Sequence, residues 1–83
     1  MKIARFKVTN EILHQEGNLF SEGVFKLGFT IIRMESLMEF NSNYVYVTAP
    51  FFDDVEQGDL TPELLIKISL DDYGDKVFSY EML

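Results

Sequence analysis

The sequence predicts a mainly β or α+β fold, built on an antiparallel sheet of about five strands with at most one or two short helices. Several short segments alternate apolar and polar residues with the period of two that a half-buried strand requires. Turn-forming residues separate these segments, and the connections are too short for the crossovers of a parallel sheet. A length of 83 residues is typical of one small domain, which we place at residues 1–83.

The first predicted strand spans residues 3–9, where apolar residues at positions 4, 6 and 8 alternate with Arg5 and Lys7. The two basic side chains should therefore share an exposed face. The next segment, residues 10–18, is ambiguous and contains His14, the only histidine. Because the chain has no cysteine, this histidine lacks partners for a zinc site, and we expect a surface or half-buried residue with no metal and no other cofactor.

Two predicted strands follow in the middle of the chain. Apolar residues alternate through residues 24–30, so we predict a strand there, with Gly28 marking a bulge or a tight bend. Residues 30–40 fit both a strand pattern and a helical stripe. We expect a strand through Met34 and leave residues 35–40 open between strand and helix.

The strongest β signal is residues 44–48, which are all Tyr, Val or Thr. Turn residues 41–43 precede this segment, and Pro50 ends it because proline cannot donate to a sheet ladder. Neither face of the strand is charged. We therefore expect both faces to be at least partly covered, and we predict a central strand or a strand whose second face meets a partner.

Residues 51–62 form the main predicted loop. Of the two aromatic residues that open it, Phe51 and Phe52, we expect one to be buried and the other exposed. The acidic residues of this loop do not have the spacing of an EF-hand calcium loop, so they do not predict a calcium site.

A C-terminal hairpin is predicted from two alternating segments, residues 64–70 and 77–82, on either side of the turn-forming residues 71–75. The alternative is a helix in this part of the chain. Thr61 would be its N-cap and Pro62 its first residue, a position that proline favours.

The charge distribution is uneven along the chain, whose net charge is −7. Residues 1–34 carry five basic and three acidic side chains, whereas residues 35–83 carry two basic and eleven acidic ones. The second part should repel phosphate backbones and attract basic surfaces. The acidic candidates for contact with a partner are Asp53, Asp54, Glu56, Asp59, Asp71, Asp72 and Asp75.

The sequence offers no recognisable catalytic pattern. It contains neither a nucleophile elbow nor a glycine-rich phosphate loop, and we interpret it as a non-enzyme. The first residues lack the apolar core of a signal peptide, and no apolar run approaches the roughly 20 residues of a membrane span. We expect a cytoplasmic protein that does not contact membranes.

These observations favour a small acidic inhibitor or regulator that binds a protein partner. It would occupy the basic surface of a nucleic-acid-handling protein as a nucleic-acid mimic, like phage-encoded inhibitors of host defence. Aromatic residues could contact the partner or form a homodimer, and the candidates are Tyr44, Tyr46, Phe51 and Phe52.

Residues 29–50 contain a recognisable succession of segments. Phe29-Thr30-Ile31-Ile32 is an aromatic-aliphatic strand, Leu37-Met38-Glu39 resembles Val-Ile-Glu, and a turn and a strand ending in Ala49-Pro50 follow. This succession resembles the core of the stage V sporulation protein G family. The resemblance implies a small antiparallel fold, dimerisation and site-specific nucleic-acid binding in a bacterial or phage context. The family follows its proline with Ser, Lys and Arg, whereas this chain has Phe-Phe-Asp-Asp, so the family's nucleic-acid contacts do not carry over.

The resemblance defines an alternative function, a dimeric nucleic-acid-binding regulator. Such a protein would have to gather its basic residues on one face of the dimer, and the candidates are Lys2, Arg5, Lys7, Lys26 and Arg33. A third hypothesis is a structural subunit of a larger assembly, which fits the uncharged face of Tyr44 and Tyr46.

Overall fold

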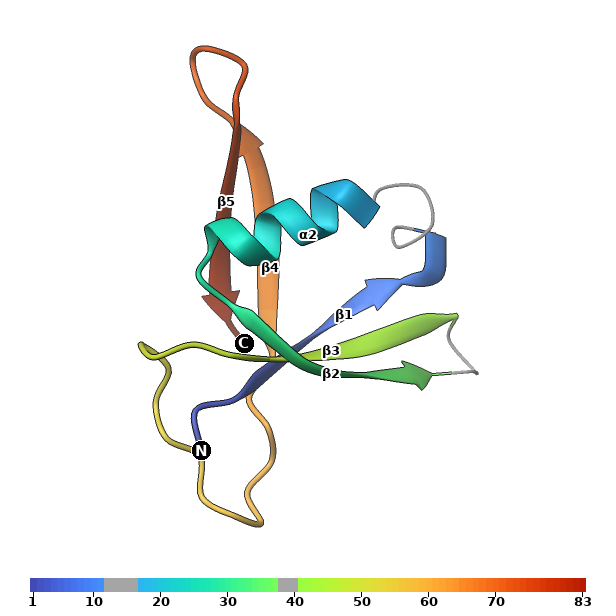
Figure 1. Ribbon diagram of the computed structural model, residues 1–83, viewed down its shortest axis with the longest axis vertical. Coiled ribbons are helices and arrows are strands. Elements are labelled where there is room, and N and C mark those ends of the chain that lie inside the picture. Colours follow the sequence, from blue (N-terminus) through green and yellow to red (C-terminus); the bar gives the residue numbers. More distant parts are fainter. Residues whose placement is uncertain (12–16, 38–40) are drawn as a thin grey trace.

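The computed structural model describes residues 1–11, 17–37 and 41–83 (Figure 1). The elements of this described part are β1 (Ala4–Thr9), α2 (Gly17–Lys26), β2 (Thr30–Leu37), β3 (Ser42–Thr48), β4 (Leu64–Leu70) and β5 (Lys76–Met82). The strands form two antiparallel sheets, one of order β1-β3-β2 and one of order β4-β5. The predicted fold class is confirmed, and the structure adds the division of the strands into two sheets. The predictions for His14 and residues 38–40 lie outside the described residues.

β3 is the central strand of the three-stranded sheet, as predicted. It pairs with β1 on one side and with β2 on the other. Val45 and Val47 are fully buried on the face toward α2, and Tyr46 is buried on the opposite face. Both faces are therefore covered, which explains why this strand can be apolar and aromatic throughout.

β1 shows the predicted alternation, because its apolar residues Ala4, Phe6 and Val8 are buried in the core. The start of β4 lies beside it, where Glu63 forms a parallel bridge with Arg5. The backbone N–H of Arg5 also donates to the carbonyl of Pro62 at 2.9 Å. These contacts join the hairpin to the edge of the three-stranded sheet.

The prediction of a strand over residues 24–30 is wrong, because this segment begins as the last turn of α2. Phe20 and Val24 lie one helical turn apart and both pack toward the core, whereas Phe25 is 83% exposed. A strand would have placed Phe25 and Leu27 on one face. The apolar residues of this segment alternate as they would in a strand, and the segment is too short to distinguish the strand period from the helical period.

Gly28 ends the helix and does not mark a bulge. Its φ angle is +76°, a left-handed conformation that glycine adopts without a steric penalty. The N–H of Phe29 donates to the carbonyl of Val24, and the N–H of Gly28 donates to that of Phe25, at 3.0 and 3.1 Å. This is the Schellman arrangement of a helix C-terminus, and it turns the chain directly into β2.

β2 extends through Met34, as predicted, and continues through Glu35 to Leu37. Its register against β3 shifts between Ile31 and Arg33, so one extra residue lies in the strand at that point. For the open segment 35–40, the structure therefore shows strand in its first half.

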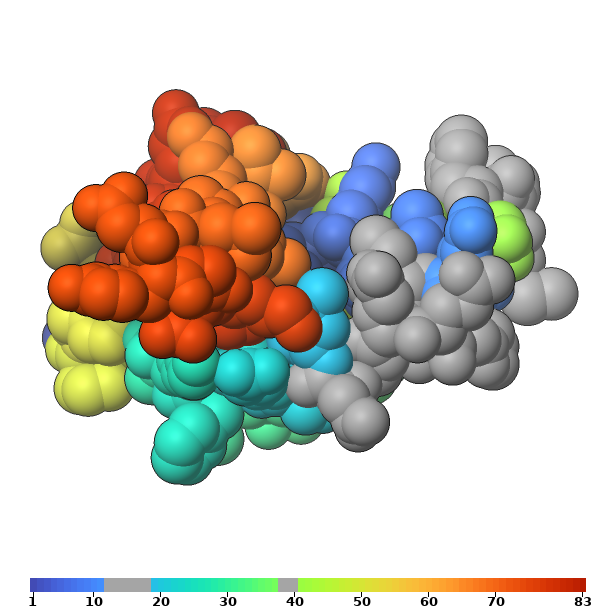
Figure 2. Space-filling model, turned by 90° about the horizontal axis from the view of Figure 1, so that it is seen from above, coloured from blue at the N-terminus to red at the C-terminus, as the bar shows by residue number. Residues whose placement is uncertain are grey.

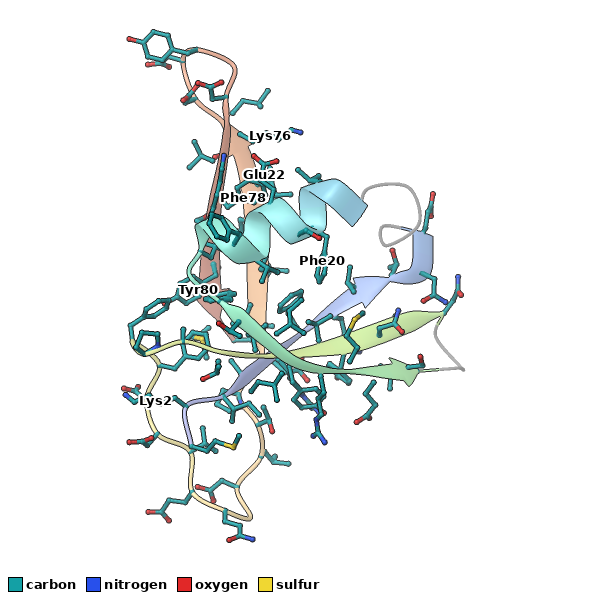
Figure 3. All side chains as sticks on the ribbon, in the orientation of Figure 1. Lys2, Phe20, Glu22, Lys76, Phe78 and Tyr80 are labelled. Atoms are coloured by element: carbon teal, nitrogen blue, oxygen red, sulfur yellow. The ribbon has the colours of Figure 1, made fainter. Side chains whose placement is uncertain are left out.

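The C-terminal hairpin is confirmed, with β4 and β5 joined by the turn at residues 71–75. The hairpin extends beyond the helix at one end of the molecule (Figure 1). Seen from above, it lies beside α2 (Figure 2). Phe78 of β5 contacts the helix where Gly23 leaves room for its ring (Figure 3).

The core lies between α2 and the three-stranded sheet. The start of β4 and the segment after β3 close it, through Leu64 and Phe52. Phe52 is 7% exposed and Phe51 is 53% exposed, which confirms that only one of the two is buried. Among the residues that the structure describes, no helix combines the length and the apolar character needed to cross a membrane.

Candidate functional site

The predicted acidic residues form two separate groups at opposite ends of the molecule (Figure 1). One group lies in the loop at residues 53–59 after β3, and the other lies in the hairpin turn at residues 71–75. The molecule measures 44 Å along its longest axis, which runs between these ends. The acidic candidates therefore do not form one continuous surface.

In the hairpin turn, one carboxylate has a structural role. Oδ1 of Asp71 accepts hydrogen bonds from the backbone N–H groups of Tyr73 and Asp75, both at 2.9 Å. Gly74 adopts a φ angle of +81° beside them. Asp71 thus shapes the turn, whereas the side chains of Asp72 and Asp75 are exposed to solvent.

An aromatic cluster lies beside the acidic loop at residues 53–59, where the chain leaves β3. Phe51 and Phe52 are in contact edge to face, with ring centroids 5.3 Å apart. Tyr80 of β5 stacks on Phe51 at 6.1 Å and meets Phe52 edge to face at 6.3 Å. Figure 3 shows Tyr80 on the side of the molecule where this loop begins. Phe29, the residue before β2, contacts all three rings from the core.

These rings border a surface hollow of about 300 Å³. Two adjacent aspartates, Asp53 and Asp54, also line the hollow, beside the aromatic rings. The remaining lining residues are apolar or proline: Ile3, Val55, Pro62 and Met82. Aromatic faces beside carboxylates form an environment that favours a cation, because the negative face of a ring and a carboxylate both attract positive charge.

We call this surface the aromatic–acidic hollow. The loop that forms it is held by contacts to the first residues of the chain. The ammonium of Lys2 donates to the carbonyls of Pro50 and Phe52, at 3.1 and 3.0 Å. The N–H of Val55 donates to the carbonyl of Met1 at 2.8 Å, and the amino group of Met1 lies 3.5 Å from Asp54. Within the described part of the chain, no basic side chain pairs with Asp53.

The aromatic candidates Tyr44 and Tyr46 lie elsewhere, on the sheet face turned away from α2. The Arg5 guanidinium lies 4.1 Å from the centre of the Tyr44 ring and donates to the Tyr46 hydroxyl at 3.3 Å. It also forms an ion pair with Glu63 at 3.0 Å, and Glu63 accepts a hydrogen bond from Tyr44 at 3.0 Å. The pKa of Arg5 is raised, first because of its hydrogen bond with Tyr46.

Two further basic candidates share this face. The guanidinium of Arg33 lies 4.2 Å from the centre of the Tyr46 ring, and the ammonium of Lys7 lies 5.4 Å from that of Tyr44. The structure thus brings together Arg5, Lys7 and Arg33, but Glu63 neutralises one of these charges. Arg5 and Arg33 both contact Tyr46, which is buried on this face.

The other two basic candidates lie apart from this face. Lys26 is on α2, where it forms an ion pair with Glu22 one turn earlier at 2.9 Å. Lys2 is bound to the carbonyls beside the aromatic–acidic hollow. The five basic candidates are therefore not gathered on one face of this chain.

Sequence reasoning missed two features of these surfaces. Tyr80 and Glu63 complete the hollow and the arginine network, but both come from the hairpin, and no local signal marks contacts with residues so distant in sequence. A second, mainly apolar hollow of about 350 Å³ lies between β1, α2 and β4. Phe6, Phe20 and Ile66 are among its lining residues, and the sequence did not indicate a hollow there.

No group of three or more metal-ligating side chains occurs in the part of the chain that the structure describes. No protein-family model, curated protein or solved structure matches this chain.

Proposed function

We propose that this chain is a non-enzymatic protein-binding module whose partner presents a basic segment to the aromatic–acidic hollow. The observation that carries the proposal is the convergence of exposed aromatic rings and carboxylates at one place. Phe51 and Tyr80 are partly exposed, and Asp53 and Asp54 line the same hollow. Aromatic residues are the commonest anchors of protein interfaces, and they bind cations on their faces.

The charge of the chain supports a basic partner. Beyond the hollow, the same loop carries Glu56 and Asp59, so a positively charged surface would meet several carboxylates in succession. Such complementarity increases the rate of association and disfavours acidic partners. Proteins that handle nucleic acids present basic surfaces of this kind, and an inhibitor or regulator that covers such a surface would compete with phosphates.

The contacts of the basic residues make a nucleic-acid partner a weaker proposal. Arg5 is bound to Glu63, Lys26 to Glu22, and Lys2 to two backbone carbonyls. Non-specific affinity for nucleic acid depends on basic side chains that can neutralise phosphates. Each of these three basic candidates would have to leave an ion pair or a hydrogen bond to do so.

The experiment compares two doubly substituted variants in capture from cell lysate treated with nuclease. Phe51→Ala with Asp53→Lys alters the hollow, whereas Tyr73→Ala with Asp72→Lys makes the same kind of change at the hairpin turn. Both variants raise the net charge by the same amount. We expect proteins that elute from the natural chain at high salt to be lost from the hollow variant and retained by the turn variant.

Asp53→Lys alone should reduce capture in the same direction, because Asp53 is exposed and its substitution leaves the aromatic packing in place. Circular dichroism would establish that each variant is folded. Capture that is unchanged in the hollow variant, or lost equally in the turn variant, would contradict the proposal.

A second measurement tests the nucleic-acid alternative directly. Fluorescence anisotropy of mixed-sequence DNA and RNA oligomers, titrated with the protein at about 50 mM salt, favours the detection of phosphate contacts. We expect no salt-sensitive binding. Binding that weakens steeply with salt would support the nucleic-acid-binding regulator instead.

A further inference from the structure

β2 is an edge strand of the three-stranded sheet. It pairs with β3 along one side, and no described strand pairs with its other side. Every residue from Thr30 to Ser36 is exposed. An exposed edge of this length presents a row of backbone donors and acceptors to which another strand can pair.

The side chains on this edge are unusually apolar for a solvent-exposed strand. Ile31 and Ile32 are each 41% exposed, and Met34 is 48% exposed. Edge strands that avoid association usually carry several charges or a proline. Here two charged residues, Arg33 and Glu35, lie on either side of Met34.

The arrangement of these charges is self-complementary. Arg33 and Glu35 point to the same face of the sheet, since they lie opposite Tyr46 and Tyr44 of β3. When two copies of one strand pair antiparallel about a two-fold axis, one residue lies opposite itself. If that residue is Met34, each Arg33 faces Glu35 of the other copy. If it is Arg33 or Glu35, like charges face each other, which is destabilising.

We propose that two copies of this chain pair through β2 in antiparallel orientation, with Met34 on the two-fold axis. The two three-stranded sheets then form one continuous sheet of six strands. The second copy is the occupant that the edge fits best, because the same residues supply both halves of the charge pattern. The irregularity between Ile31 and Arg33 limits regular pairing about this axis to residues 33–35.

The packing of Arg33 also prepares it for this contact. Its guanidinium lies over the Tyr46 ring at 4.2 Å, so the side chain is already ordered on the face where the partner's carboxylate would arrive. An ordered side chain loses less conformational entropy on association. On the opposite face, the two Met34 side chains would meet and remove apolar surface from water.

Charge exchange tests the pairing. Sedimentation equilibrium should show a dimer of the natural chain, and Arg33→Glu or Glu35→Arg alone should weaken dimerisation by at least about tenfold, because two attractions become two repulsions. The double variant Arg33→Glu with Glu35→Arg should restore it. Glu81→Arg, which reverses an exposed strand charge on the hairpin, should leave dimerisation unchanged.

Disulfide formation tests the register. The chain has no cysteine, so Met34→Cys introduces a single thiol, which should form a disulfide dimer because directly opposed residues lie within bridging distance. Ile32→Cys is the matched control, since its two copies would be roughly 13 Å apart in this register. Equal crosslinking of the two variants would overturn the proposed register.

A natural chain that is monomeric up to millimolar concentration would refute the dimer. A dimer that neither single charge variant weakens, or that the double variant does not restore, would place the interface elsewhere. The inference is independent of the proposed function, because Phe51→Ala with Asp53→Lys should not affect dimerisation and Arg33→Glu should not alter the hollow.

Discussion

The contact between Gly23 and Phe78 leads to a prediction in which helix propensity and packing change the stability of the fold in opposite directions. Gly23 lies in the interior of α2, where replacing glycine by alanine ordinarily stabilises a helix by about 0.5–1 kcal/mol. A Cβ atom at this position would lie 2.8 Å from Cδ1 and 2.9 Å from Cε1 of Phe78. Contacts this short require the ring or the helix to move.

We expect Gly23→Ala to destabilise the fold. Forcing an extra carbon into a packed contact typically costs about 1–3 kcal/mol, which exceeds the gain in propensity. The net loss should therefore be up to about 2 kcal/mol, a large fraction of the roughly 4–12 kcal/mol expected for a domain of this size. Urea unfolding followed by circular dichroism measures the change in the free energy of unfolding.

Introducing Gly23→Ala into a Phe78→Ala variant separates the steric cost of the substitution from its gain in helix propensity. Without the ring, alanine at position 23 has no close neighbour to displace, and the same substitution should stabilise the protein by about 0.5–1 kcal/mol. The sign of the effect thus reverses between the two backgrounds. A Gly23→Ala variant that is as stable as the natural chain, or equally destabilised in both backgrounds, would refute the proposed packing of β5 on α2.

Three further predictions concern the core, the hairpin turn and the helix surface. Val47→Ala should lower the free energy of unfolding by about 2–3 kcal/mol, because Val47 is fully buried; a loss below about 1 kcal/mol would contradict that burial. Asp71→Ala should destabilise the hairpin by about 1 kcal/mol whereas Asp71→Asn should not, since asparagine retains an oxygen for the two backbone donors; equal losses in thermal melts would contradict this role. The pKa of Glu22 is lowered, first by its hydrogen bond with Lys26, so its contribution is present at neutral pH and lost in acid. Urea midpoints of Glu22→Gln should therefore fall less between neutral pH and mild acid than those of the natural chain, and an equal fall would argue against the pair.

The candidate site could be predicted from the sequence only in part. Phe51, Phe52, Asp53 and Asp54 are adjacent in the chain, so their proximity follows from the sequence itself. Tyr80 completes the hollow from β5, and nothing in the local pattern of that strand indicates which distant loop it meets. The two acidic groups could not be placed relative to each other for the same reason, and the fold separates them to opposite ends.

Sequence alone determined the features that depend on neighbouring residues. The central strand, the first strand and the C-terminal hairpin follow from side-chain alternation and turn chemistry, which act within a few residues. The helix was missed because Gly28 ends it through a left-handed conformation and hydrogen bonds with Val24 and Phe25, while the apolar spacing allows either period. Only the tertiary structure decided that Arg5 would pair with Glu63 and that no described strand would pair with the outer edge of β2. Both depend on which surfaces the core leaves exposed, and burial of the core is a property of the whole chain.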